Sequence, residues 1–149
     1  MKIEIKNLKV IMSMSEATFC YTATIYVDGK PFCYAKNRGD GGADFYDAHE
    51  KFTGHFRSKL NELDEVCIKW GEYGFEGWIA LQIDDELMRK DLKRLMKNKI
   101  VTLRDETIFA TNIKYIKTHH EIIVRKLNCS QILNAMKFDD AFDIYKRYA

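Results

Sequence analysis

The sequence predicts an α+β fold, in which an antiparallel sheet with an N-terminal hairpin packs against amphipathic helices. Three observations predict it. Asp28-Gly29 stands between two apolar runs, and this dipeptide is a strong signal for a two-residue hairpin turn. Apolar residues alternate before this turn and just after it, and further along the chain they recur at spacings of three and four, which is the change from strand to helix period. The composition, 46% hydrophobic and 31% charged, is that of an ordinary globular chain.

Three strands are expected ahead of the helices. Residues 2–12 alternate with a change of phase near Asn7, which predicts a bulged first strand. Residues 18–27 and 30–37 form the two arms of the hairpin, because both are apolar runs of period 2 that flank the turn.

The register of the hairpin follows from its turn. A two-residue turn pairs Val27 with Lys30, and further along it pairs Cys20 with Asn37. Pro31 indicates that the third strand lies at an edge of the sheet, because proline has no amide hydrogen to give to a neighbouring strand.

Helices are expected in the middle of the chain. Apolar residues at spacings of three and four predict a helix over residues 44–64 and a second over 84–98, the latter with Asp84 or Asp85 as its N-cap. Residues 66–82 interleave aromatic side chains with glycines. An irregular excursion, a short hairpin and a broken helix all remain open for that stretch.

The last third of the chain alternates between the two kinds of element. A second hairpin turns at Asp105-Glu106, and Thr118 and Glu121 form a capping box at the start of a short helix. The predicted strands are residues 100–104, 107–113 and 131–133, and an amphipathic helix covers residues 138–145. A single domain over residues 1–149 is expected, and a division into lobes 1–82 and 83–149 is the alternative.

The hydropathy, cysteines and histidines of the chain argue against a membrane protein, a disulfide-bonded protein and a metal-binding protein. No apolar run approaches the ~18–20 residues of a membrane span, and the N-terminus is a strand pattern without an export signal, so a bacterial cytoplasm and reduced thiols are expected. There is no Cys-x-x-Cys pair, and His49 and His55 fall on different faces of the predicted helix. No metal, no cofactor and no membrane partner are therefore expected.

The first candidate site is the glycine-rich segment after the hairpin. Its candidate residues are Asn37, Arg38, Gly39, Gly41 and Gly42. At a junction between a strand and a helix, their amides could hold an anion. The alternative is a loop that needs positive φ angles, and the segment matches neither the dinucleotide-binding nor the P-loop pattern.

Two further surfaces are candidates for binding a ligand or partner. Residues 89–99 hold six basic side chains against one acid, which suits contact with phosphates, and an ordinary solvated face is the alternative. Aromatic side chains at 70–78 could stack on bases or anchor a protein, or else cover the core. The candidate residues are Arg89, Lys90, Lys93, Arg94 and Lys97 in the first surface and Trp70, Tyr73 and Trp78 in the second.

No catalytic signature is visible in the chain. There is no nucleophile elbow and no Ser-His-Asp order, so an enzyme is not the favoured class. The enzymatic alternative is a small nuclease or nucleotide hydrolase that uses Asp40, Asp44 and His49.

Two motifs carry a family resemblance. The run from Phe19 to Lys30, followed by Asn37-x-Gly39-x-Gly41-Gly42, resembles the start of small proteins of unknown function that bacteriophages and prophages encode. Leu133-Asn134 before an amphipathic helix resembles their end, whereas residues 66–99 have no counterpart.

The resemblance implies a non-enzymatic accessory protein that inhibits a host process, antiviral defence foremost. It would do so by binding a host protein complex or the nucleotide or nucleic-acid ligand of that complex. A nucleic-acid-binding or nucleic-acid-processing protein of phage replication is the alternative, and a homo-oligomer remains open.

Overall fold

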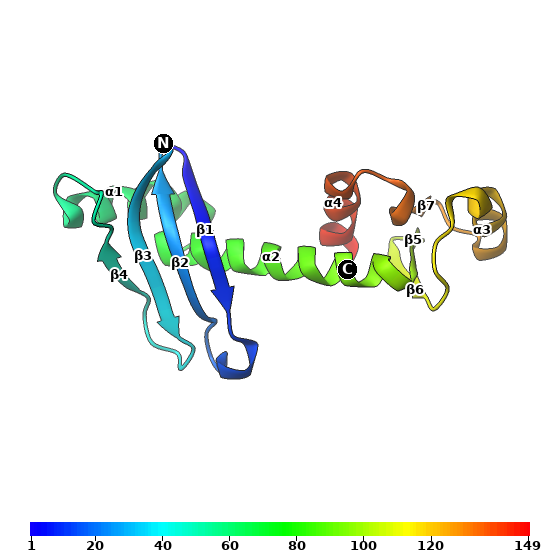
Figure 1. The fold of residues 1–149 in the computed structure, drawn as a ribbon, viewed down its shortest axis with the longest axis horizontal. Coiled ribbons are helices and arrows are strands. Elements are labelled where there is room, and N and C mark those ends of the chain that lie inside the picture. Colours follow the sequence, from blue (N-terminus) through cyan, green and yellow to red (C-terminus); the bar gives the residue numbers. More distant parts are fainter. The chain divides into compact units, whose positions relative to one another are not determined.

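The computed structural model describes all of residues 1–149, which form two compact units, Met1–Asp85 and Glu86–Ala149 (Figure 1). Each unit contains an antiparallel sheet and helices, which confirms the α+β class. Helix α2 (Gly74–Asn98) contributes its first half to one unit and its second half to the other. None of the helices combines the length and the apolar character that crossing a membrane requires.

The first unit is built on a four-stranded sheet. Its strands are β1 (Ile3–Val10), β2 (Cys20–Val27), β3 (Lys30–Arg38) and β4 (Phe45–Ala48), which are neighbours in chain order. The predicted hairpin is confirmed, and both turn residues, Asp28 and Gly29, have positive φ. The predicted bulge in the first strand is also confirmed, because the register shifts between Lys6 and Lys9 and Asn7 has a φ of 53°.

The prediction that the strand of Pro31 lies at an edge of the sheet is wrong, because β3 lies between β2 and β4. Pro31 itself has no partner in β4, which pairs only with Cys33–Lys36, and a bulge lies next to it in the pairing with β2. Pro31 pairs with Tyr26 and Cys33 pairs with Ile25, so Phe32 is the extra residue.

The bulge also corrects the register of the hairpin. Val27 pairs with Lys30 as predicted, but Cys20 lies opposite Arg38 and not opposite Asn37. The extra residue lets Phe32 and its neighbour Cys33 both be buried.

The predicted helix over residues 44–64 is wrong in its first half. The chain first forms β4, whose Phe45 pairs with Lys36 of β3, and only then α1 (Phe56–Cys67). His55 caps α1, because its Nδ1 accepts a hydrogen bond from the Ser58 amide at 3.2 Å. Hydrogen bonds to β3 outweigh the local helical period, which is a tertiary effect that spacing cannot reveal.

Residues 66–82 resolve into the end of one helix and the start of another. A single 3₁₀ turn, Ile68–Trp70, follows α1, and α2 begins at Gly74, ten residues before the predicted start. Asp84 and Asp85 are therefore not its N-cap. A carboxylate of α1 takes that role, since Asp64 Oδ1 accepts the Phe75 amide at 3.0 Å.

Both helices of the first unit cover the same face of its sheet (Figure 1). On the α1 side, the ring of Phe56 lies 5.2 Å from that of Phe32 in β3. On the α2 side, the ring of Phe75 lies 5.1 Å from that of Tyr46 in β4. The core of this unit therefore lies between the sheet and the helix pair.

The second unit has a three-stranded sheet in the order β6-β5-β7. Its strands and helices are β5 (Ile100–Arg104), β6 (Thr107–Thr111), α3 (His120–Leu127), β7 (Gln131–Ile132) and α4 (Phe138–Tyr148). The hairpin at Asp105-Glu106, the short strand and the C-terminal helix are confirmed. The capping box is wrong, because α3 begins after a 3₁₀ turn and its N-cap, His119, makes no side-chain hydrogen bond.

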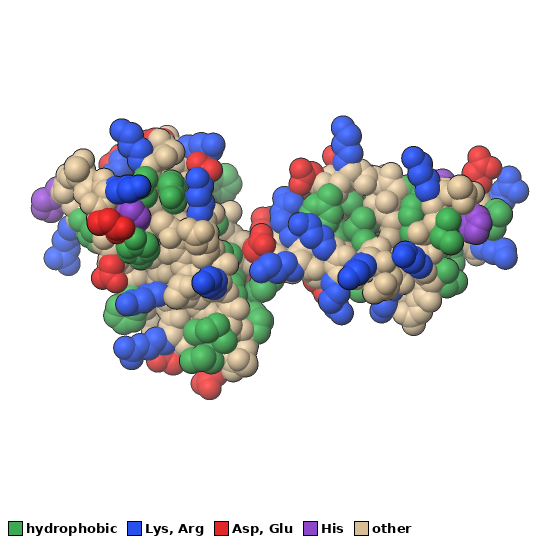
Figure 2. All heavy atoms as spheres, viewed as in Figure 1, with side chains coloured by type: hydrophobic (Ala, Val, Ile, Leu, Met, Phe, Trp, Pro, Cys, Tyr) green, Lys and Arg blue, Asp and Glu red, His purple; other side chains and the backbone are tan.

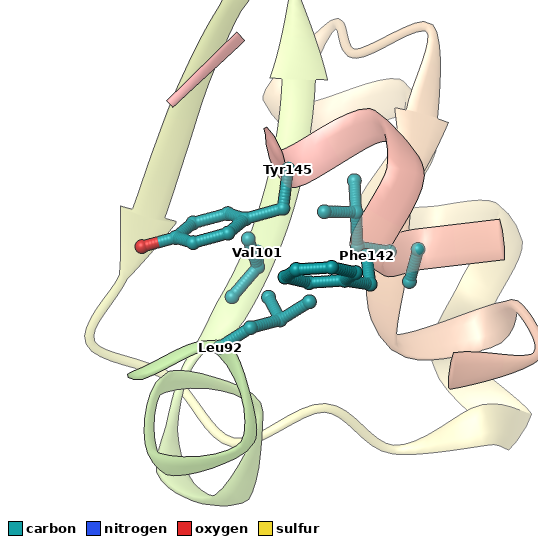
Figure 3. Close-up of a cluster of buried hydrophobic side chains, with 6 residues drawn as sticks. Leu92, Val101, Phe142 and Tyr145 are labelled. Carbon is teal, nitrogen blue, oxygen red and sulfur yellow. The ribbon is translucent and has the colours of Figure 1, made fainter. Parts of the chain in front are cut away.

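A compact apolar cluster holds the second unit together. Leu92 of α2 and Val101 of β5 meet Phe142 and Tyr145 of α4, all buried (Figure 3). Asn134 ties the same elements by hydrogen bonds, because its side chain accepts the Val101 amide and donates to carbonyls at the end of α2. The Leu133-Asn134 pair of the family resemblance therefore has a structural task here.

Candidate functional site

Asn37 organises the glycine-rich loop between β3 and β4. Its side chain is buried, and its Oδ1 accepts hydrogen bonds from the Gly39 amide at 2.8 Å and from the Thr18 hydroxyl at 2.9 Å. Its Nδ2 donates to the Gly42 carbonyl and to Asp44 Oδ1, each at 2.9 Å. Every hydrogen-bonding atom of this amide is thus engaged inside the unit.

The glycine amides of this loop also have acceptors within the chain. The Gly41 amide donates to the Thr18 hydroxyl and the Gly42 amide to Asp40. Gly39 has a φ of 84°, and a Cβ there would collide with the Met14 carbonyl, so the residue must be glycine. The loop joins β3 to β4, and no helix begins there. The helix N-terminus that was expected beside the glycines is therefore absent, although Arg38 is exposed.

A cavity lined by Glu16, Asp44 and Glu76 lies beside this loop. The Asp44 carboxylate accepts hydrogen bonds from three side chains. Oδ2 accepts hydrogen bonds from the hydroxyls of Tyr21 at 2.8 Å and Tyr46 at 3.1 Å, while Oδ1 accepts from Asn37. Burial and the neighbouring Asp44 charge raise the pKa of both tyrosines far above the ordinary value, so they stay protonated donors.

The cavity holds about 370 Å³. It is lined by Glu76, Ile79 and Ile83 of α2 and, in the β1–β2 connection, by Met12 and residues 15–19. Burial is the main cause that raises the pKa of Glu76, and the charge of Asp44 raises it further. The carboxylates of Asp44 and Glu76 thus lie close together in a space that Glu16 also lines.

Sequence reasoning missed this cavity. Asp44 was a candidate only as a hydrolase residue, and Tyr21, Tyr46 and Glu76 were not candidates at all. No local signal marks them, because β2, β4 and α2 bring them together from distant parts of the chain.

Two of the five basic residues predicted on α2 pack against α4. Arg89 forms an ion pair with Asp139 at 2.9 Å, and its guanidinium lies 4.2 Å from the centre of the Phe142 ring. Lys93 lies over the Phe138 ring at 5.0 Å. These two cations therefore contribute to the packing of the second unit.

Two more of these residues pair with acids of their own helix. Lys90 lies 3.9 Å from Glu86, and Arg94 lies 2.6 Å from Asp91. The hydrogen bonds from Arg94 and then from the Tyr145 hydroxyl lower the pKa of Asp91. Lys97 alone is exposed without an acidic or aromatic partner, so α2 offers phosphates less than its sequence suggests.

A group of free cations in the second unit lies outside α2, and sequence reasoning missed it. Lys114, Lys117, Arg125 and Lys126 are all exposed and none forms an ion pair. They belong to the β6–α3 connection and to α3 itself. Their signal in the sequence is weak, because they are spread among isoleucines and histidines.

The charge of the chain is unevenly divided between the units. Residues 1–85 hold ten Lys and Arg against fourteen Asp and Glu, a net charge of −4, and residues 86–149 hold fourteen against eight, a net charge of +6. Figure 2 shows Lys and Arg side chains spread over the visible face of the second unit. The small total charge conceals this separation.

The aromatic candidates divide into two kinds. Trp70 and Tyr73, in the α1–α2 connection, are 59% and 79% exposed, and neighbouring Ile68 is 61% exposed. Trp78 is only partly exposed, and its ring stacks on that of Phe75. The structure thus brings Trp70 and Tyr73 to one exposed connection and places Trp78 against the helix start.

The hydrolase candidates do not form a metal site. Asp40 accepts the Gly42 amide, and His49 Nδ1 accepts the Lys51 amide. No group of three His, Cys, Asp or Glu side chains in the chain could hold a metal ion. The four cysteines are buried and unpaired, and burial raises the pKa of Cys33 to about 12, so that thiol is a poor nucleophile.

Comparison of the chain with protein-family models, with curated proteins and with solved structures gives no match.

Proposed function

We propose that the protein is a non-enzymatic binding protein whose unit Glu86–Ala149 binds the phosphate backbone of a nucleic acid. The observation that supports the proposal is the net charge of +6 on this unit. A compact basic unit attracts polyanions over a distance of about 8–10 Å at physiological salt.

In this proposal the exposed cations without an ion pair bind the phosphates of the nucleic acid. Lys114, Lys117, Arg125 and Lys126 are exposed and have no acid to neutralise them, so a phosphate would be their first counter-charge. Glu121 is the only acid between Lys114 and Lys126. Backbone contacts of this kind give affinity without sequence specificity.

The resemblance to phage-encoded proteins supplies the biological setting of the proposal. A nucleic acid is a ligand of antiviral defence as well as a substrate of phage replication, so both settings agree with a basic binding unit. In the first setting the protein would inhibit a host process by occupying the nucleic acid.

The test is a titration of fluorescently labelled duplex DNA and RNA at increasing salt. The expected slope of log affinity against log salt is about −0.9 for each phosphate neutralised on duplex DNA. Changing Lys117, Arg125 and Lys126 together to Glu is expected to lower the affinity at least tenfold and to flatten the slope.

The matched control carries the same change of charge on the first unit. Lys9, Lys30 and Lys51 are exposed lysines without an ion pair, and changing all three to Glu is expected to alter the affinity much less. Equal losses in both triple variants would contradict the proposal, as would binding that does not depend on salt.

A second candidate function is the binding of a protein through the α1–α2 connection. Exposed Ile68, Trp70 and Tyr73 favour it, because Trp and Tyr dominate the energetics of protein interfaces. The partner would be a host protein or a second copy of this chain.

Sedimentation velocity at rising protein concentration tests self-association through this connection. If it occurs there, changing Trp70 and Tyr73 to Ala shifts the protein toward the monomer. Changing Phe109 and Ile113 to Ala, which removes exposed apolar side chains of the second unit, should not. An oligomer that survives the loss of both aromatic side chains would argue against this interface.

A further inference from the structure

We infer that the cavity beside Asp44 binds a small amphipathic molecule that carries a positively charged nitrogen, a primary amine in the simplest case. This site lies within the first unit and is independent of the proposed nucleic-acid contact. Its shape, the charges of its lining and the fixed position of Asp44 each support the assignment.

The cavity has the size and the apolar wall of a small-molecule site. Its volume of about 370 Å³ falls within the range of about 300–1,000 Å³ that is usual for ligand pockets. Phe19, which is half-buried, and Met12, which is 57% exposed, present apolar side chains to it, while Ile79 and Ile83 line it but are almost fully buried. A ligand with an apolar body could bury that body here and gain from the hydrophobic effect.

The charges of the lining select the sign of the ligand. Glu16, Asp44 and Glu76 line the cavity, and no Lys, Arg or His does. An anion would be repelled by these side chains, and a neutral molecule would leave them without a counter-charge. A cationic nitrogen offers both an opposite charge and hydrogen-bond donors to carboxylate oxygens.

The polar donors of the cavity already form hydrogen bonds within the protein, which also favours a cationic ligand over an anionic one. The hydroxyl of Tyr21 and the amide of Asn37 both donate to Asp44, so they are not free to serve acceptors of an anionic ligand. The same bonds hold the Asp44 carboxylate in place before a ligand arrives. Such preorganisation lowers the entropy cost of binding.

Glu76 adds a second carboxylate to the site from α2. It lies beside Asp44, whose backbone amide donates a hydrogen bond to it, and burial followed by the Asp44 charge raises its pKa. A bound ammonium group would relieve the repulsion between the two carboxylates. The ligand therefore supplies the charge that the cavity lacks.

The first experiment compares three indoles of similar size on the isotopically labelled full-length protein. Tryptamine carries an ammonium group, tryptophol a hydroxyl group and indole-3-acetate a carboxylate. Tryptamine is expected to shift the amide resonances of Phe19, Ile79 and Ile83 and to bind at least tenfold more tightly than tryptophol, with indole-3-acetate weakest. Equal affinities for the three indoles, or no shifts with tryptamine, would overturn the inference.

The second experiment changes one charge of the cavity at a time. Glu76→Gln is expected to weaken tryptamine binding about tenfold and to leave tryptophol binding unchanged. Asp84→Asn is the matched control, because Asp84 is an exposed acid of the same helix that does not line the cavity. Asp44→Asn is a poorer variant, because it also removes the acceptor of two tyrosines.

If Asp84→Asn weakens tryptamine binding as much as Glu76→Gln does, the effect comes from the overall charge of the protein and not from the cavity. That result would overturn the inference. Nucleic-acid affinity is expected to be the same in wild type and Glu76→Gln. The outcome at the cavity and the outcome at the basic unit can therefore be told apart.

Discussion

The two units of this protein present charge in opposite ways. The first unit, with a net charge of −4, gathers its key acids inside a cavity where tyrosines and an asparagine fix one of them. The second unit, with a net charge of +6, spreads unpaired cations over an exposed connection and a short helix. The contrast separates a concave site that is suited to one small ligand from an open surface that is suited to a polymer.

The two units resemble each other in how they use asparagine. Asn37 holds the glycine-rich loop of the first unit, and Asn134 ties a strand to a helix end in the second. Both residues satisfy backbone groups within their own unit. Each asparagine therefore has a structural role in this chain.

The largest expected effect tests whether the units are independent. Phe142→Ala removes a buried ring from the core of the second unit and is expected to cost about 3–5 kcal/mol of folding free energy. Hydrogen exchange resolved along the sequence should show lost protection in β5 and α4, with protection in β2 and β3 retained. Loss of protection in both units together would make them one cooperative domain.

A smaller effect tests the glycine-rich loop as scaffold. Gly39→Ala combines a φ of 84° with a collision with the Met14 carbonyl, whereas Gly29, with a φ of 79°, has open space around it. Gly39→Ala is expected to destabilise by about 2 kcal/mol or more and Gly29→Ala by about 1 kcal/mol, as measured by urea unfolding. An equal loss of unfolding free energy in the two variants would mean that the loop around Gly39 relaxes easily and is not a rigid scaffold beside the cavity.

The smallest expected effect is the contribution of Glu76 to the pH dependence of the free energy of unfolding. Because burial and the charge of Asp44, with a further contribution from Asp64, raise the pKa of Glu76, the folded protein holds the Glu76 proton more tightly than the unfolded chain does. The stability from this group is therefore present at low pH and is lost as pH rises through the raised pKa.

Glu76→Gln is thus expected to stabilise the protein at pH 7, by less than about 1 kcal/mol because the side chain is partly exposed. The gain should vanish below the ordinary glutamate pKa. Urea unfolding at pH 7 and pH 4 measures the difference, and Asp84→Asn should show none. A variant less stable than wild type at pH 7 would mean that Glu76 makes a structural contribution that outweighs its repulsion.

Local signals explain which elements were predicted correctly. Asp28-Gly29 and Asp105-Glu106 adopt positive φ and close their hairpins, because the preference for that conformation resides in the turn residues themselves. Likewise, the apolar stripe of Phe138, Phe142 and Tyr145 places α4 without reference to any partner.

Three of the wrong predictions involve partners that are distant in the sequence. The segment at Phe45 has a helical period, yet it pairs with β3. Helix α2 starts early because Asp64 caps it from α1. The strand of Pro31 is central because β4 pairs with its Cys33–Lys36 segment.

The sequence alone therefore determined the fold class, both hairpins and the C-terminal helix, because each depends on neighbours within a few residues. Only the tertiary structure decided which cations are free and that Asp44 and Glu76 lie side by side in the lining of one cavity. Ion pairs, burial and cavities depend on which distant side chains meet, and hydrophobic periodicity does not encode that.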